Sequence, residues 1–185
     1  LGFARGNYVN DPVFTASLKD DSFEAYIEGM LANIFHPTLN WDNVRELKRR
    51  VNVPVLIKGI LHPEDARLAL EAGVDGIIVS NHGGRQLDGV IGSLDALPSI
   101  VEVVSGRVPV LLDGGVYRGI DAVKALALGA TAVCIGRPFV YGLAYAGEHG
   151  VYQVMQNLYS EFKVSMGLAG QRTIAGLRDV TLVRK

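Results

Sequence analysis

The segment SNHGGRQ, residues 80–86, combines side chains that can carry out acid–base chemistry on an anionic substrate. His82 can accept a proton near neutral pH, and Arg85 can hold a carboxylate through two parallel hydrogen bonds. Gly83 and Gly84 lie between them and allow backbone angles that other residues resist, so a sharp turn can aim both side chains at one ligand. An ordinary loop is the alternative, but the position directly after an apolar run favours a catalytic His82 and a substrate-binding Arg85.

Lys58 is a second residue that suggests a site. It follows the apolar run VPVLI without interruption, and a lysine at the end of a buried strand needs an anionic partner. The alternative is a surface lysine just beyond the strand. A cation in this place could balance the negative charge of a reduced cofactor, so we expect Lys58 to bind one.

Two glycine-rich turns, DGGVYRG at residues 113–119 and GRP at residues 136–138, could bind a phosphate group. Turns that lead into helices present backbone N–H groups and the positive end of the helix dipole to an anion. Arg118 and Arg137 add positive charge beside them. Each turn alone is weak support, since glycine also serves tight turns, but together they predict a phosphate site.

The elements that must position these residues are short apolar strands alternating with helices. Strands are expected at residues 53–58, 74–80, 108–113 and 131–136, and helices at residues 62–73 and 118–129. In the first helix Pro63 suits the first turn and Gly73 the C-terminal cap. The alternation predicts βαβ units, with the polar strand ends converging at one edge of a parallel sheet.

An internal repeat sharpens the fold prediction. VPVLIKG at residues 53–59 recurs as VPVLLDG at residues 108–114, and DARLALEAG recurs as DAVKALALG. Four β/α units repeated in pairs are half of a (β/α)8 barrel, which usually needs about 250 residues. The alternative is an open doubly wound sheet, but its dinucleotide fingerprint does not follow any of the strands.

Helices are expected on either side of these strands. One begins at Asp21 or Ser22 and a second covers residues 41–50, with Trp41, Val44 and Leu47 on one face. Near the other end an apolar stripe at helical spacing joins Val151, Val154, Leu158, Phe162 and Met166. Core packing explains all three stripes. We expect one domain, residues 1–185, made of a helical region (1–52), the four strands (53–136) and C-terminal helices (137–185).

The composition excludes several classes of protein. The chain of 185 residues is 49% hydrophobic with a net charge of -1, so no nucleic-acid surface is expected. No apolar stretch is long enough to span a membrane, and the start LGFARGNY lacks a signal peptide's order of charged and apolar regions. The only cysteine, Cys134, lies in an apolar run, so we expect a reducing compartment, by default the cytoplasm. The four histidines are scattered, so no metal is expected. The missing initial methionine suggests a truncated or processed product.

Together the motifs resemble those of the FMN-dependent 2-hydroxy-acid dehydrogenases and oxidases, the family of glycolate oxidase, lactate oxidase and lactate 2-monooxygenase. The resemblance rests on IKG, SNHGGRQ, DGGV and IGRP and covers residues 40–185. It implies a TIM barrel of which this chain holds the C-terminal four β/α units. The stretch NYVNDPVF and the ending DVTLVRK are most similar to lactate 2-monooxygenase.

The resemblance also implies roles for the candidate residues. Lys58 would contact the N1/O2 edge of the flavin, and Ser80 would help to hold the ring. His82 would be the base that removes a proton from an L-2-hydroxy acid such as lactate, and Arg85 would bind the carboxylate of that acid. Both residues would also contact the flavin. The ribityl and phosphate cradle would comprise Asp113, Gly114, Gly115, Val116, Tyr117, Gly136 and Arg137.

Two departures from the family pattern matter. Tyr117 stands where the family commonly has an arginine, so phosphate binding is reduced or differently supplied. The first four strands are also missing, and with them a substrate-binding tyrosine and the aspartate that pairs with the base. We therefore expect a homo-oligomer or association with a missing N-terminal half. A flavin barrel that catalyses isomerisation and a non-catalytic fragment remain as alternatives.

Overall fold

The computed structural model describes residues 8, 10–34 and 36–183, and the chain divides into two compact units, residues 1–40 and 41–185. The expected helix at Asp21 or Ser22 includes residue 35, which lies outside the described residues. The division into two units does not decide whether the whole chain is one domain, which stays a prediction.

The first unit contains helices α1 (Pro12–Ala16) and α2 (Phe23–Ile34). Asp11 begins α1 because its side chain accepts hydrogen bonds from the first backbone N–H groups. Ser22 does the same for α2 at 3.0 Å from the nitrogen of Ala25, close to the predicted start. The ring of Phe14 packs on that of Tyr26 with centroids 5.4 Å apart. Helix α1 had no sequence prediction.

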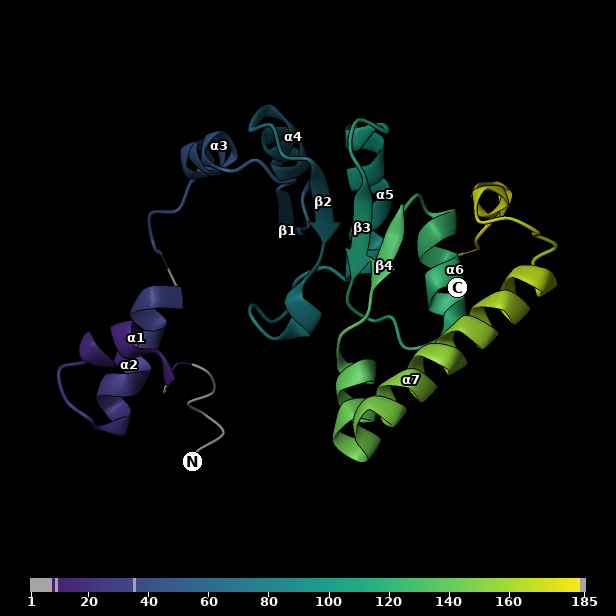
Figure 1. Ribbon diagram of the computed structural model, residues 1–185. Helices are drawn as coiled ribbons and strands as arrows, with labels where there is room; N and C mark the ends of the chain where they lie inside the picture. Colours follow the sequence, from purple (N-terminus) through teal and green to yellow (C-terminus); the bar gives the residue numbers. More distant parts are fainter. Residues whose placement is uncertain (1–7, 9, 35, 184–185) are drawn as a thin grey trace. The chain divides into compact units, whose positions relative to one another are not determined.

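A four-stranded parallel sheet forms the centre of the second unit. Its strands are β1 (Leu56–Ile60), β2 (Gly76–Val79), β3 (Val110–Asp113) and β4 (Ala132–Cys134), in the order β1-β2-β3-β4. Figure 1 shows all four arrows pointing the same way. The predicted βαβ units are confirmed. Within the described residues β1 and β4 are edge strands, each paired on one side only.

Helices of the second unit alternate with these strands. They are α3 (Trp41–Arg50), α4 (Pro63–Glu71), η3 (His82–Gly84), α5 (Ser93–Val104), α6 (Gly119–Ala127), α7 (Arg137–Leu168) and η4 (Ala175–Asp179). Helix α4 has Pro63 in its first turn, and Gly73 after its end has φ +80°, as predicted. Helix α5, between β2 and β3, had no sequence prediction.

The first strand differs from its predicted bounds of 53–58. It begins later and continues past Lys58 to Ile60, so the prediction that Lys58 ends the strand is wrong. The cause is an irregularity in the pairing with β2 between Lys58 and Ile60. Gly59 lies there with φ +104°, a backbone angle that glycine adopts without strain. The other three strands lie inside their predicted ranges but are shorter.

Buried apolar residues of the strands and of α4 and α5 form the main core. Ile77, Val79, Leu97 and Ile100 are fully buried there, and Trp41 packs against its edge. Leu47, expected on the same inward face of α3 as Trp41, is instead 48% exposed, so that part of the prediction is wrong.

Helix α7 begins at Arg137, fourteen residues before the first residue of the predicted stripe, and changes direction at Ala146 and Gly147, whose backbone angles are not helical. The stripe that follows does face the protein: Leu158 is buried, and Phe162 and Met166 pack beside Leu177. Figure 1 shows this long helix running beneath α6. Contact with α6 is close because Gly119, the first residue of α6, has no side chain; a Cβ there would lie 2.0 Å from the nitrogen of Phe162.

Candidate functional site

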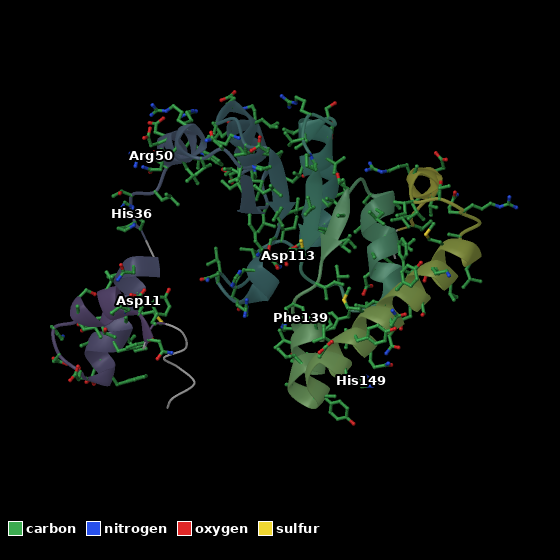
Figure 2. The ribbon with its side chains drawn as sticks, viewed as in Figure 1. Asp11, His36, Arg50, Asp113, Phe139 and His149 are labelled. Carbon is green, nitrogen blue, oxygen red and sulfur yellow. The ribbon has the colours of Figure 1, made fainter. Side chains whose placement is uncertain are left out.

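The polar residues singled out in the sequence lie where the strands end. In Figure 1 the loop containing η3 and the first turns of α7 lie at the end of the sheet toward which the arrows point. Figure 2 places Asp113 at this end of β3 and Phe139 in the first turns of α7. Parallel strands therefore bring distant segments of the sequence to one edge.

Three side chains form a hydrogen-bonded group: one from β1, one from the residue after β2 and one from β3. The ammonium of Lys58 lies 2.9 Å from Oγ of Ser80 and 2.9 Å from Oδ2 of Asp113. The Ser80 hydroxyl in turn donates to Oδ2 of Asp113. Ser80 is 1% exposed, so it lies behind Lys58 and Asp113 and joins them. The anionic partner that a lysine in this strand requires is therefore a carboxylate of the chain itself.

Asp113 stays ionised in this group. Burial alone would raise the pKa of its carboxyl, but the hydrogen bonds from Ser80 and Lys58, together with the charge of Lys58, outweigh burial and hold that pKa below its usual value. The Lys58–Asp113 ion pair thus joins β1 to β3 across the intervening strand β2.

His82 and Arg85 lie together on the loop after β2. Nη2 of Arg85 is 3.0 Å from Nε2 of His82, and Nε of Arg85 is 3.3 Å from the His82 carbonyl oxygen. Both residues are exposed. The predicted pair is therefore close enough to act on one ligand.

These residues surround one pocket of about 250 Å³. Two candidates, Ser80 and Arg118, do not line it. The candidates that do are Lys58, His82, Arg85, Asp113, Gly114, Gly115, Val116, Tyr117, Gly136 and Arg137.

Backbone rather than side chains forms much of one wall. Gly115 has φ +75°, and nothing lies within 4 Å of the place where a Cβ on Gly115 or Gly136 would stand. A side chain at either position would therefore point into open space. This glycine-lined wall, with the guanidinium of Arg137 beside it, suits an anionic group such as a phosphate.

The two arginines expected near the phosphate behave differently. Arg137 lines the pocket, and its Nη2 donates to the carbonyl oxygen of Gly83 at 3.1 Å. Arg118 instead lines a separate depression beside Ser160 and Glu161 and caps α6. Its expected contribution to the phosphate site is absent from this arrangement. The backbone N–H groups of Tyr117 and Arg118 donate hydrogen bonds to Oδ2 of Asp121, at 3.1 and 2.9 Å, and so are not free to bind a phosphate.

Sequence reasoning missed three residues at this site. Asn81 and Ser93 hold the loop of His82 through hydrogen bonds. Cys134, expected to be buried, is only partly buried and lines the pocket. Burial and the charge of Asp113 raise the pKa of its thiol. The signal for Cys134 was its place at the end of β4, where side chains that point into the site alternate with those that point away.

Two kinds of site are absent from the part of the chain that the structure describes, a metal site and a membrane-spanning helix. No group of three or more His, Cys, Asp or Glu side chains there could hold a metal ion. No helix in the same residues has both the length and the apolar character to cross a membrane.

Comparisons with known proteins give the site its context. The model of the FMN-dependent dehydrogenase family matches residues 6–184. This chain belongs to the FMN-dependent dehydrogenase family. It is 71% identical over 184 residues to an L-lactate oxidase of Lysinibacillus sphaericus, covering 100% of this chain and 48% of that protein. It is 52% identical over 155 residues to 2-hydroxyacid oxidase 1 of Mus musculus, covering 84% and 42%.

Solved structures of the family agree with the fold. A mandelate oxidase bound to 3,3-difluoro-2-hydroxy-3-phenylpropionic acid superposes with a TM-score of 0.76 at 47% identity, covering 81% of this chain and 45% of that one. The chain therefore has the α/β fold of this TIM-barrel family and spans about half the length of the relatives it matches. The finer assignment to lactate 2-monooxygenase stays a prediction.

Proposed function

We propose that this chain supplies the flavin- and substrate-binding residues of an FMN-dependent enzyme that oxidises an L-2-hydroxy acid, lactate-like in size, to the 2-oxo acid. The observation that carries the proposal is the convergence of His82, Arg85 and the Lys58–Asp113 pair on one pocket in a member of this family. The 71% identity to an L-lactate oxidase supports the choice of substrate.

The residues present fit FMN. The glycine-lined wall with Arg137 could hold the phosphate, and Lys58 would present a cation to the ring. Asp113 and Ser80 would keep that ammonium in place, because both are hydrogen-bonded to it. Tyr117 lines the same pocket and could offer its hydroxyl where the family commonly has an arginine.

The residues divide the chemistry among them. FMN, when bound, would accept the two reducing equivalents that leave the substrate. Arg85 would hold the substrate carboxylate through two hydrogen bonds and so fix the orientation of the carbon that is oxidised. Nε2 of His82 would accept the proton that leaves the substrate. Lys58 would stabilise negative charge that develops nearby.

Partners and compartment belong to the same proposal. The edges of β1 and β4 carry unpaired backbone groups, which supports association with further β/α units or with another copy. We propose a homo-oligomer or a complex with a complementary half, acting in the cytoplasm. The single cysteine of the chain supports a reducing compartment.

A chimera tests the proposal. This chain would replace the matching 184-residue segment of the Lysinibacillus sphaericus L-lactate oxidase, and the purified protein would be titrated with FMN and then mixed with L-lactate without oxygen. We expect FMN to bind and its absorbance to bleach on addition of L-lactate. A protein that binds FMN yet stays yellow with every short 2-hydroxy acid would refute the substrate assignment.

A further inference from the structure

We propose that Ser93, the first residue of α5, is a positioning residue for the base His82, and that it acts through Asn81. For its catalytic part this inference rests on the proposed function. Ser93 lies eleven residues after His82 in the sequence, outside the SNHGGRQ segment, and does not line the pocket of the candidate site. Its role follows from how the loop backbone is held.

The backbone of His82 is strained. Its φ is +55°, in the left-handed region that residues with a Cβ rarely adopt. Gly83 and Gly84 follow with φ +68° and +72°, which glycine tolerates. Because the left-handed conformation of His82 is costly, the surrounding structure must select it.

Hydrogen bonds within the loop stabilise this conformation of His82. The N–H of His82 donates to Oγ of Ser80 at 3.0 Å, and the N–H of Gly83 donates to Oδ1 of Asn81 at 3.1 Å. The N–H of Gly84 donates to the Asn81 carbonyl oxygen, also at 3.1 Å. Asn81 therefore holds both glycines that follow the base, and the position of His82 depends on where Asn81 is fixed.

Ser93 fixes Asn81. Its Oγ accepts the N–H of Asn81 at 3.1 Å, and Ser93 itself is only 5% exposed. Because it lies in the start of α5, whose inner face is part of the core, its hydroxyl oxygen is a rigid anchor. Loss of this acceptor would leave a partly buried N–H unsatisfied, which costs more than an ordinary exposed hydrogen bond.

The same two side chains also fit the glycine turn of the cofactor site. A Cβ on Gly114 would lie 3.2 Å from Oγ of Ser93 and 3.3 Å from Oδ1 of Asn81. Gly114, with φ +99°, lines the pocket. Ser93 thus contacts the loop that carries the base and packs beside the turn that lines the cofactor wall, so it sets their relative position.

Amide exchange tests the structural part on the 185-residue chain itself, independently of any activity. In Ser93→Ala, the Gly83 and Gly84 amides should exchange about 10-fold faster or more than in the unchanged chain. Ser99→Ala is the matched control, because Ser99 is on the same helix and donates only to the Ala96 carbonyl; it should leave both amides unchanged. Unchanged exchange in Ser93→Ala would overturn the inference, whatever the outcome for FMN.

Kinetics of the chimera test the positioning part. In Ser93→Ala the rate constant of flavin reduction, per bound flavin, should fall about 10-fold to 100-fold, while the FMN dissociation constant changes less than about threefold. Ser93→Thr keeps the oxygen and should restore most of the rate. A lower melting temperature with an unchanged rate constant would mean that Ser93 only stabilises the fold, and would contradict the proposal.

A second variant covers the case in which Ser93→Ala does not fold. Asn81→Ala removes the acceptor of the Gly83 amide and should give the same loss of rate and the same faster exchange of Gly83. Asn81→Asp keeps a side-chain oxygen and should retain slow exchange at Gly83. Equal exchange in both variants would refute the part assigned to Asn81.

Discussion

Nη2 of Arg85 lies 3.0 Å from Nε2 of His82. A guanidinium has only donors, so a hydrogen bond between these two atoms needs Nε2 of His82 as its acceptor. A substrate carboxylate that binds Arg85 would come close to the same nitrogen, which is the geometry that proton removal from a 2-hydroxy acid requires.

Arg85→Lys in the chimera should weaken substrate binding more than it slows chemistry. An ammonium cannot reproduce the planar two-point hydrogen bonding to a carboxylate, and hydrogen bonds to charged groups contribute about 1.5–3 kcal/mol. We expect the dissociation constant for L-lactate to rise about 10-fold or more. Arg107→Lys is the control, since Arg107 donates to the Val104 carbonyl at the far end of α5. An unaffected dissociation constant in Arg85→Lys would mean that Arg85 is structural.

Asp113 should make stability depend on pH in the acid range. Its pKa is lower in the folded chain than in the unfolded one, so its stabilising contribution is present above the unfolded pKa, about 3.9, and is lost as the pH falls through the folded pKa. Asp113→Asn should therefore be less stable than the unchanged chain near pH 6, and the gap in melting temperature should narrow as the pH falls below about 4. A gap of constant size down to pH 2 would show that ionisation of Asp113 does not stabilise the fold.

Cys134 should react slowly with alkylating reagents at neutral pH. Its thiol pKa is raised by burial and then by the charge of Asp113, and only the thiolate is nucleophilic. Because the chain has one cysteine, mass spectrometry after iodoacetamide treatment reports this site alone. The rate should keep rising with pH beyond the point at which an ordinary thiol levels off, and Asp113→Asn should speed the reaction at pH 8. Rapid modification at pH 7 would contradict the assigned environment.

The isolated 185-residue chain should associate with itself. Strands β1 and β4 each have a free edge among the described residues, and Leu56 in β1 is 40% exposed; exposed edges of this kind pair with other chains. Size-exclusion chromatography with light scattering should show dimers or larger species. Ala132→Lys, at the exposed start of β4, should shift the chain toward monomer. A monomer at all concentrations would refute the predicted self-association. Lactate turnover by that monomer would refute the expectation that the isolated chain lacks part of the active site.

Several features were predictable because they depend on strand topology or on local chemistry. Asp113 and Arg137 line one pocket as predicted, since parallel strands bring their ends together. Pro63 begins a helix because its φ suits a first turn and its missing N–H is not needed there. The catalytic and binding roles assigned to the pocket residues stay predictions.

Other features depend on long-range contacts, which no local pattern encodes. Ser93 reaches the loop of His82 only because α5 packs against the sheet, and an ordinary serine at a helix start carries no sign of that. Lys58 was placed at a strand end because the apolar run stops there, whereas the pairing with β2 resumes beyond the irregularity at Gly59. Arg118 was assigned to the phosphate site from its neighbours in sequence, but it lines a different depression.

The central claim, that His82 is the base of a flavin-dependent oxidation, is tested most directly by one rate constant. Anaerobic stopped-flow measurement of flavin reduction by L-lactate in the chimera and in its His82→Gln variant would give it. We predict that the variant still binds FMN and that its reduction is slower by about 100-fold to 10,000-fold, the usual contribution of a general base. Reduction at the unchanged rate, with FMN bound, would contradict the account.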